Sequence, residues 1–487
     1  MKVLAFDFGA SSGRAIIGNY ENGIISIEEI HRFDNDPVLV DGSFYWDILR
    51  LFHEIKQGIT KAKNQTDFES IGIDTWGVDY GVLTKNNDLI GNPYNYRDAR
   101  TVGVPEEMES LITKEELYNL TGNQIVNFNT VFQLYAFKKQ KPELLELVDK
   151  VLFIPDLFNY FLTGKMAAEC SIASTSQLMN PYTKEWEYKI MDKLGLKREW
   201  FPEIVPGGTV IGNLKSDICE ELDMTEKKVI AVSSHDTASA VAAVPTTEKD
   251  FVFISCGTWS LFGTELEKPV ISDLSRKYNI TNETGYNNTT RFLKNIIGLW
   301  LIQETRRQFK REGKNYSYAD MEMLAREEEP FRCFIDPDFP EFMGPGNMPQ
   351  RIKDFCARTG QYVPETDGAV IRCIYESLAM KYKHTFLQLK ECCDKDFSVI
   401  HMVGGGTKDT FLCQMTANAA NVPVIAGPIE GTAAGNIAVQ LISNGAISDI
   451  WEARKIIAKS FDVVHYEVED NKSWEDAYEN FKKIVLD

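Results

Sequence analysis

The sequence lacks the long apolar segments that would place the chain in a membrane or direct its export. No apolar run approaches the ~18 residues that a bilayer-spanning helix needs. The opening MKVLAFDF is interrupted by Asp7, so it is too short for the apolar region of a signal peptide. We therefore expect a cytoplasmic protein that has no membrane partner.

The sequence also lacks paired cysteines. Its nine cysteines are scattered and form no C-x-x-C pair, which argues against a zinc site and against a secreted disulfide framework. We expect most of them to be small core residues. Cys356 and Cys373 flank a polar loop and could approach one another, but no disulfide between them is expected in a reducing compartment.

Basic residues are too few to balance the acidic ones. The chain has 71 Asp and Glu against 52 Lys and Arg, which gives a formal net charge of −19. Such a charge repels nucleic acid, so we expect no nucleic-acid partner. No Walker motif G-x-x-x-x-G-K-[ST] is present. A phosphorylated small ligand would have to be met by backbone N–H groups and a bound divalent cation.

What the sequence does contain is an alternation of short apolar strands and amphipathic helices. Strands are predicted at 3–8, 71–74, 229–232, 252–255 and 399–403, and helices at 46–63 and 371–389. This alternation indicates an α/β fold, in which ligands bind at the carboxyl ends of strands. With 487 residues, the chain is expected to form two domains.

A faint internal repeat supports the division into two. VLAFDFGASSGR and FVFISCGTWSLF each run from an apolar strand to a glycine and then to serine or threonine, about half the chain apart. A duplicated α/β domain, in which each half contributes one turn to a shared cleft, would explain this pattern. The polar segment 245–250 would join the halves. We therefore predict domains at 1–245 and 246–487.

The first glycine turn has three interpretations. Gly9 to Gly13 fits the G-x-S-x-G pattern of a hydrolase nucleophile elbow, but only one strand precedes it and no histidine motif is tied to Ser11. It could instead be a tight hairpin. It could also bind phosphate through the N–H groups around Ser11, Ser12 and Gly13, with Asp7 facing a magnesium ion. Arg14 would then add positive charge or face solvent.

Three further stretches carry candidate chemistry. Thr258 follows the second glycine turn, and the run Gly404 to Gly406 leaves bare backbone for a ring or a phosphate, unless it is only a flexible turn. Asp236 lies between a strand and a small-residue helix, where this stretch alone favours a helix cap over a general base. Segments 73–79 and 96–100 suit either the binding of a polyol or a structural ion-pair network.

Taken together, these stretches resemble the FGGY carbohydrate kinases, which share the two-domain ATPase fold of actin, hexokinase and Hsp70. The resemblance covers nearly the whole chain in the right order. It is carried by DFGASSGRA (7–15), IGIDTWGVDYG (71–81), NYRDART (95–101), SHDTASAV (234–241), SCGTWSL (255–261), KNIIGLWLIQE (294–304), VGGGTKD (403–409) and AGPIEGTAAGN (426–436). It implies two duplicated actin-like, ribonuclease H-like ATPase domains that flank a central cleft.

The resemblance also implies roles for particular residues. The positions that match ATP-binding positions of the family are Ala10, Ser11, Ser12, Gly13, Arg14, Thr258, Gln303 and Gly405. Those that match sugar-binding positions are Gly77, His235, Asp236, Thr237 and Asn295. Asp236 corresponds to the proton acceptor, and Asp7 is expected to face Mg²⁺.

The activity implied is transfer of phosphate from Mg-ATP to the C1 hydroxyl of a ketose by a monomer or homodimer. The resemblance implies L-rhamnulose as the ketose, with a related deoxyketose such as L-fuculose as the alternative. An actin-like ATPase without sugar kinase activity and a sugar sensor without turnover are further alternatives. Two departures from the family pattern are Cys256, where many relatives have serine, and the continuation Thr407-Lys408-Asp409.

Overall fold

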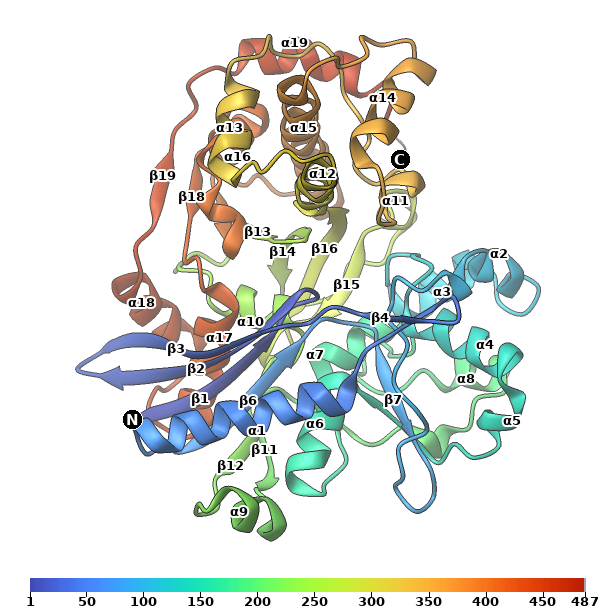
Figure 1. Cartoon of the computed structure of the whole chain (residues 1–487), viewed down its shortest axis with the longest axis vertical. Helices are drawn as coiled ribbons and strands as arrows, with labels where there is room; N and C mark the ends of the chain where they lie inside the picture. Colours follow the sequence, from blue (N-terminus) through green and yellow to red (C-terminus); the bar gives the residue numbers. More distant parts are fainter. Residues whose placement is uncertain (486–487) are drawn as a thin grey trace. The chain divides into compact units, whose positions relative to one another are not determined.

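The computed structural model describes residues 1–485, which form two compact units built from non-contiguous segments (Figure 1). Unit 1 comprises Met1–Thr247, Glu265–Phe292 and Glu430–Asp462. Unit 2 comprises Glu248–Thr264, Leu293–Ile429 and the segment from Val463 onward. The chain therefore passes between units within strands β14 (Trp259–Leu266) and β16 (Thr290–Ile297). The domain division at 245 and 246 stays a prediction.

The first large sheet has six strands in the order β11-β12-β6-β1-β2-β3. Strand β1 pairs antiparallel with β2 and parallel with β6, and β12 pairs parallel with β6 and antiparallel with β11. The predicted apolar strands form its centre. Its members are β1 (Lys2–Phe8), β2 (Ser12–Glu21), β3 (Ile24–Asp34), β6 (Ser70–Thr75), β11 (Thr209–Asn213) and β12 (Lys228–Ala231).

The second large sheet has seven strands in the order β15-β16-β14-β13-β17-β18-β19. Strand β13 pairs antiparallel with β14 and parallel with β17, and β18 pairs parallel with β17 and antiparallel with β19. This repeats the order and directions of β2-β1-β6-β12-β11, so the predicted duplication is confirmed. Its remaining members are β13 (Val252–Cys256), β15 (Thr281–Thr284), β17 (Ile400–Val403), β18 (Val424–Ala426) and β19 (Val464–Tyr466).

Helix α1 (Ile48–Gln65) confirms the amphipathic helix predicted near its bounds. Asp47 caps it by accepting a hydrogen bond from the Arg50 N–H at 3.3 Å. Its buried face includes Ile55 and Ile59, spaced by one helical turn. Each buried isoleucine of this kind stabilises the fold by about 1.5 to 3 kcal/mol. The second predicted helix is part of the longer α15 (Asp367–Cys393).

Two helices of unit 1 approach each other very closely and fix the backbone near the candidate site. Helix α10 (Asp236–Ala242) packs on α17 (Gly431–Ser443), which also packs on β1 and β6. A Cβ at Gly435 would lie 1.8 Å from the Ser239 carbonyl oxygen. Only glycine therefore permits this separation, and α10 is held with its first residue, Asp236, near the carboxyl ends of β1 and β6.

Shorter elements complete the two units. The remaining helices of unit 1 are α2 (Val104–Met108), α3 (Lys114–Thr121), α4 (Thr130–Gln140), α5 (Pro142–Leu145), α6 (Ile154–Thr163), α7 (Cys170–Ala173), α8 (Tyr188–Leu194), α9 (Ser216–Leu222), α11 (Asp273–Lys277) and α18 (Ile450–Ser460). Those of unit 2 are α12 (Trp300–Arg311), α13 (Tyr318–Arg326), α14 (Met348–Arg358), α16 (Thr410–Ala420) and α19 (Lys472–Phe481). Three strand pairs are β4 (Val38–Val40) with β5 (Ser43–Tyr45), β7 (Tyr80–Leu83) with β8 (Lys150–Phe153), and β9 (Ala168–Glu169) with β10 (Ile204–Val205). Within residues 1–485, no helix combines the length and the hydropathy needed to cross a membrane.

Candidate active site

The first glycine turn is a hairpin whose backbone carbonyl groups accept hydrogen bonds from within the protein. It joins the antiparallel strands β1 and β2, and the Gly9 N–H donates to the Ser12 carbonyl at 2.9 Å. Asn35 donates its side-chain amide to the Gly9 carbonyl at 2.8 Å and its backbone N–H to the Ser11 carbonyl at 3.1 Å. Within residues 1–485 the N–H groups of Ala10 and Ser11 have no acceptor. A strand-to-strand turn is not a nucleophile elbow, which joins a strand to a helix.

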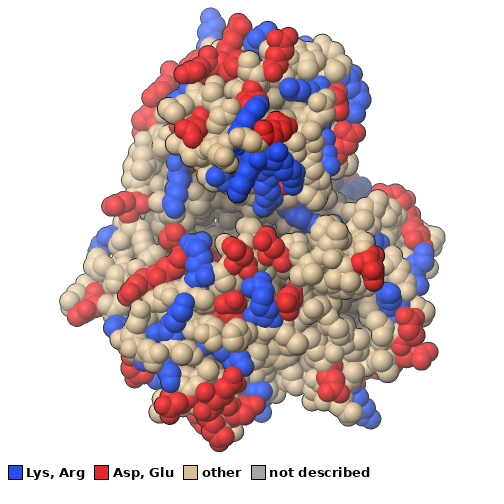
Figure 2. Space-filling view, in the orientation of Figure 1, with Lys and Arg blue, Asp and Glu red and all other residues tan. Residues whose placement is uncertain are grey.

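The second glycine turn repeats this geometry in unit 2. It joins β13 to β14, and the Gly257 N–H donates to the Trp259 carbonyl at 2.8 Å. The hydroxyl of Thr258 donates to the side-chain carbonyl of Gln303 on α12 at 3.4 Å, so two predicted ATP-binding residues lie in contact. Helix α12 also carries exposed basic side chains, and Lys and Arg side chains gather on unit 2 in Figure 2, where they oppose the negative charge of the chain locally.

The triple glycine has one open position and one crowded one. A Cβ at Gly405 would meet no atom within 4 Å, whereas a Cβ at Gly406 would lie 2.2 Å from the Cys256 sulfur. Gly404 has φ of +93°, which favours glycine. Two residues of the Thr407-Lys408-Asp409 continuation have structural roles. The Thr407 hydroxyl donates to the Gly404 carbonyl, and the Asp409 side chain caps α16. Gly405 alone therefore presents open backbone.

Asp7 and Arg14 lie opposite each other at the end of the first hairpin. Asp7 also pairs in register with Asp74 on the parallel strand β6. Arg14 contacts Asp7 at 2.5 Å and forms a second ion pair with Glu430. Burial alone would lower the pKa of Arg14, but the charges of Asp7 and Glu430 raise it overall. Arg14 therefore does not face solvent, the alternative left open by the sequence, but bridges two carboxylates.

Three carboxylates of unit 1, those of Asp7, Asp74 and Asp236, repel one another electrostatically. Asp74 is fully buried; its Oδ2 accepts from Asn436 at 2.6 Å, while its Oδ1 lacks a partner among the described residues. Burial raises the pKa of Asp74 well above its ordinary value, and the charges of Asp7 and Asp236 raise it further. A buried unpartnered oxygen beside two more carboxylates is a donor set that suits a hard divalent cation. The residues present therefore fit the predicted magnesium ion.

Asp236 is the first residue of α10 and not its cap, which corrects the interpretation favoured by that stretch alone. The capping position belongs to His235, whose side chain makes no capping bond. The Asp236 carboxylate accepts from the Thr237 N–H at 2.6 Å and the Thr237 hydroxyl at 3.2 Å. Burial raises the pKa of Asp236, partly offset by His235, and the charge of Asp7 adds to the rise. The side chain remains 28% exposed, so a ligand can reach it.

His235 connects Asp236 to a buried ion pair that the sequence did not predict. Its Nε2 lies 3.5 Å from Asp236 Oδ1, and its Nδ1 lies 3.3 Å from Glu283 Oε2. Arg291, fully buried, lies 3.1 Å from the same Glu283 oxygen. Burial would raise the pKa of Glu283, but Arg291 and His235 lower it overall. Glu283 therefore stays charged, and the imidazole ring of His235 is held through its Nδ1, which lies within hydrogen-bond distance of Arg291 Nη2 at 3.2 Å.

Gly77 lies beside the same imidazole. A Cβ at Gly77 would lie 3.3 Å from His235 Nε2 and from the Thr175 side chain. The backbone behind the ring is fixed as well, because the N–H groups of Ser234 and His235 donate to Glu169 and to the Ser171 hydroxyl, each at 3.1 Å.

The predicted sugar residues of unit 1 are thus brought together. They are Gly77, His235, Asp236 and Thr237. The remaining one, Asn295, lies on β16 in unit 2.

The segment 73–79 contains one carboxylate that is structural. Asp79 accepts from the indole N–H groups of Trp46 at 2.6 Å and Trp76 at 3.0 Å, and from the Gln133 amide at 2.8 Å. Burial raises the pKa of Asp79 to about 6 despite these bonds. With its oxygens already bonded, Asp79 anchors the loop that carries Gly77 and has little capacity left for a polyol.

The comparisons with known proteins identify the class. The N-terminal domain of the FGGY family of carbohydrate kinases matches residues 2–243, and its C-terminal domain matches residues 252–443. The chain belongs to the FGGY family of carbohydrate kinases. Members of this family act on a small-molecule sugar with ATP as co-substrate, so the protein is an enzyme, a sugar kinase.

Similar curated proteins narrow the class to one kind of kinase. The rhamnulokinase of Bacteroides thetaiotaomicron is 42% identical over 99% of both chains. The rhamnulokinase of Oceanobacillus iheyensis is 43% identical over 95% of this chain and 97% of its own, and that of Bacillus subtilis is 39% identical over 94% of both.

Solved structures agree on the fold. A xylulose kinase from Lactobacillus acidophilus has a TM-score of 0.83 at 17% identity, covering 99% of this chain and 97% of its own. Plasmodium falciparum glycerol kinase with ADP has a TM-score of 0.79 at 15% identity, covering 100% of this chain and 98% of its own. The predicted two-domain ATPase fold is therefore confirmed.

Proposed function

We propose that the protein transfers the γ-phosphoryl group of ATP to the C1 hydroxyl of L-rhamnulose, giving L-rhamnulose 1-phosphate and ADP. The observation that carries the proposal is Asp236, which has a raised pKa and an exposed edge and lies against the His235 imidazole. The similarity to rhamnulokinases at about 40% identity supports L-rhamnulose over other ketoses.

Asp236 is the proposed general base. A carboxylate takes a proton from a sugar hydroxyl more readily when its pKa is closer to the working pH, and burial raises that of Asp236. Thr237 fixes the carboxylate through its N–H and hydroxyl, and His235 Nε2 lies 3.5 Å from the same carboxylate oxygen, Oδ1. The freed C1 oxygen then attacks the γ-phosphorus in line, and ADP leaves.

The nucleotide residues have complementary tasks in the proposal. The unpartnered N–H groups of Ala10 and Ser11 would donate to phosphate oxygens, with Ser12, Gly13 and Arg14 completing the turn. Thr258 and Gln303 would contact ATP from the second turn. Gly405 would lie against the adenosine, because its backbone is open. These three belong to unit 2.

Asp7 and Asp74 would hold Mg²⁺, through water or directly. The ion, when bound with ATP, neutralises negative charge on the transferring phosphoryl group. Arg14 forms an ion pair with Asp7, and Asn436 donates a hydrogen bond to Asp74. We further propose that the enzyme works in the cytoplasm as a monomer or homodimer, with domains 1–245 and 246–487 and no nucleic-acid partner, which its charge of −19 disfavours.

The test is the rate of ADP release from Mg-ATP by purified protein with L-rhamnulose, L-fuculose, D-xylulose, glycerol or no sugar. We expect the highest kcat/KM with L-rhamnulose and a rate near background without sugar. A higher kcat/KM with L-fuculose would change the proposed substrate but leave the proposed sugar kinase activity standing. Equal release in every reaction would contradict sugar phosphorylation altogether.

A further inference from the structure

The imidazole of His235 has charged neighbours at both of its nitrogens. Its Nδ1 lies 3.2 Å from Arg291 Nη2 and 3.3 Å from Glu283 Oε2, and its Nε2 lies 3.5 Å from Asp236 Oδ1. In a neutral imidazole one nitrogen carries the proton and the other accepts a hydrogen bond. The partner of Nδ1 therefore decides what Nε2 can offer to a ligand.

The contacts of Nδ1 distinguish the two tautomers. Arg291 carries only N–H donors, so a hydrogen bond between its Nη2 and Nδ1 requires Nδ1 to be the acceptor. A protonated Nδ1 would instead need Glu283 as its acceptor. The contact with Arg291 has hydrogen-bond geometry, whereas Glu283 Oε2 accepts no hydrogen bond within residues 1–485. The ring proton of His235 is therefore expected on Nε2.

Arg291 is fixed in the position from which it makes this contact. It lies on β16, its side chain is fully buried, and its Nε donates to the Thr284 backbone carbonyl on β15 at 3.1 Å. Its Nη2 also lies 3.1 Å from Glu283 Oε2. Burial lowers the pKa of Arg291, and the charge of Glu283 opposes this effect. Glu283 thus offsets the charge, while the guanidinium contacts the ring.

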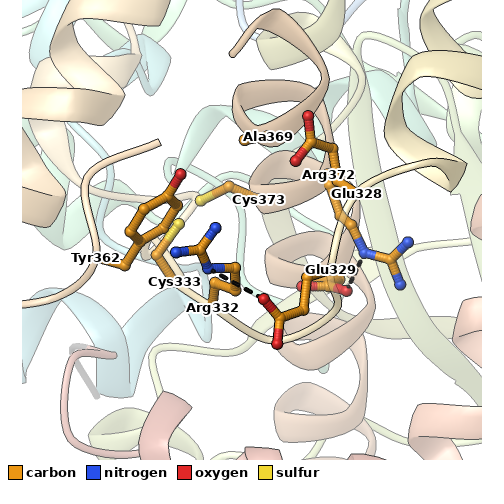
Figure 3. A pocket seen from close by; sticks show the side chains of 9 residues that line it. Glu328, Glu329, Arg332, Cys333, Tyr362, Ala369, Arg372 and Cys373 are labelled. Carbon is orange, nitrogen blue, oxygen red and sulfur yellow. Dashed lines mark hydrogen bonds and ion pairs between the residues drawn. The ribbon is translucent and has the colours of Figure 1, made fainter. Parts of the chain in front are cut away.

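Another arginine–glutamate pair, in unit 2, shows how a self-contained ion pair differs. Arg372, drawn in Figure 3, donates from its Nε to Glu376 Oε1 at 2.7 Å, and Glu376 Oε2 accepts from a backbone N–H at 2.9 Å. Both oxygens of Glu376 are therefore hydrogen-bonded. Beside His235, by contrast, Glu283 Oε2 and Arg291 Nη1 have no hydrogen-bond partner among the described residues. This arrangement sacrifices bonds within the pair and keeps the bond to the ring.

Nε2 has room beside it for a ligand. In the described part of the chain, residues 1–485, no hydrogen bond joins Nε2 to a protein group. A Cβ at Gly77 would lie 3.3 Å from Nε2, so glycine leaves space next to this nitrogen. The neighbouring Asp236 side chain is 28% exposed. A ligand oxygen can therefore approach a donor at His235 and an acceptor at Asp236 together.

We propose that Arg291 is a positioning residue of the sugar site, which donates to His235 Nδ1 and so keeps the ring proton on Nε2 for an oxygen of the ketose. Glu283 offsets the buried charge of Arg291 and does not bind the ring proton. A sugar hydroxyl can then accept from His235 and donate to Asp236. The inference rests on the proposed function, in which Asp236 is the general base.

The first experiment determines the tautomer of His235 in the unmodified full chain, without sugar or ATP. The six histidines are labelled with ¹⁵N in their rings, and His235→Gln identifies the signals of this ring by their loss. We expect the NMR correlations to show a protonated Nε2 and an unprotonated Nδ1. A protonated Nδ1 would overturn the proposal. This result does not depend on whether the protein phosphorylates a ketose, or on whether any variant folds.

Two variants separate the roles of Arg291 and Glu283. Arg291→Met leaves Glu283 as the charged neighbour of Nδ1, so we expect the ring proton to move to Nδ1. Glu283→Gln removes the carboxylate charge but leaves the Arg291 donor, so the tautomer should stay. Arg372→Met, which breaks the ion pair of unit 2, is the matched control with no change expected. An unchanged tautomer in folded Arg291→Met, or a changed one in Glu283→Gln or the control, would contradict the assignment.

Kinetics tests the consequence for the sugar. Arg291→Met should raise KM for L-rhamnulose about tenfold, because one hydrogen bond to the ketose is lost, and should change kcat and KM for ATP less than about twofold. Arg372→Met should leave all three parameters unchanged. An unchanged KM for L-rhamnulose, or an equal rise in KM for ATP, would overturn the positioning role. Absence of turnover by the parent with every ketose would instead contradict the proposed function.

Discussion

The two glycine hairpins have the same backbone geometry but differ in the charge of the side chains around them. In the first, Asp7 pairs across the sheet with Arg14 on one side and Asp74 on the other. In the second, the residue at the matching position is Ser255, and its partners are Leu261 and Val403. Every charged residue of the first set thus has a neutral counterpart in the second.

This difference shows how a duplicated fold divides its work. The strand order and the turn supply backbone N–H groups in both units, whereas the carboxylates that we propose bind a cation and accept a proton occur at the first hairpin and at α10, both in unit 1. Unit 2 instead offers the Thr258 hydroxyl and the open backbone at Gly405. The scaffold is therefore shared, while the chemistry depends on a few side chains at the strand ends.

The largest effect is expected from removing the charge of Asp236. Asp236→Asn keeps the size of the side chain and can still accept from Thr237, so the fold should persist. We expect turnover with L-rhamnulose to fall by about 10²-fold or more, because the base is lost. The exposed Asp217→Asn in the same unit is the control, with no change expected. Undiminished kcat in a folded Asp236→Asn variant would rule out Asp236 as the base.

The same residue predicts a pH dependence. The base must be deprotonated to act, and its pKa is raised above the ordinary aspartate value of 3.8. Turnover should therefore decline as pH falls through this raised value, at a higher pH than for an unperturbed aspartate. A kcat profile that stays flat down to about pH 4 would contradict this assignment.

The matching positions of the two hairpins provide the next test. Asp7→Ala should raise the Mg²⁺ concentration needed for half-maximal activity by roughly tenfold, because one proposed ligand is lost. Ser255→Ala changes the corresponding residue of unit 2 and should leave the Mg²⁺ requirement unchanged. The measurement is the initial rate across a Mg²⁺ titration at saturating ATP. An equal shift in both variants would remove the distinction between the hairpins.

The sequence predicted the two glycine turns because their signals are local. An apolar strand, a glycine and small polar residues suffice to predict a turn at the end of a strand, and Asp7 lies next to that turn in the sequence. The sequence places Asp74 only in a segment that suits either the binding of a polyol or a structural ion-pair network. Its proximity to Asp7 depends on parallel pairing between β1 and β6, which no local pattern determines.

Other contacts lacked any sequence signal. Glu283 and Arg291 lie in a stretch of mixed polar residues, and each becomes significant only because β15 and β16 bring them to His235. The stretch around Asp236, taken alone, favours a helix cap over a general base because a strand followed by aspartate and a small-residue helix is common to both roles, and only the resemblance to the family predicts the proton acceptor. Whether a carboxylate caps a helix or remains available to bind a ligand depends on its burial and on the packing around it.

Substitutions at the adjacent glycines Gly405 and Gly406 of unit 2 are expected to have different effects, one on ATP binding and the other on stability. Gly406→Ala would place a Cβ 2.2 Å from the Cys256 sulfur, so we expect a loss of stability of about 1 to 3 kcal/mol. Gly405→Ala meets no neighbour and should leave stability unchanged while raising KM for ATP a few fold. Urea unfolding and ATP kinetics distinguish the two. Cys256→Ala should partly rescue Gly406→Ala, and the absence of rescue would show that the sulfur is not the obstacle.

The smallest effect concerns the cost of keeping Asp74 charged. Its folded-state pKa is raised above the ordinary 3.8, so its ionisation weakens the fold as pH rises through the raised value and costs nothing at lower pH. Asp74→Asn removes this cost and retains an oxygen for Asn436.

In Mg²⁺-free buffer we therefore expect the variant's Tm to exceed that of the parent by ~2 °C at about pH 8 and to match it at about pH 4. The variant should also require more Mg²⁺ for activity. A lower Tm at both pH values would mean that Asp74 stabilises the fold as an anion, and its place in a cation site would lose its physical basis. A site that keeps an uncompensated charge for a ligand is expected to lose stability in exchange for function. A lower Tm of the variant at both pH values would mean that no such trade-off exists at the end of β6.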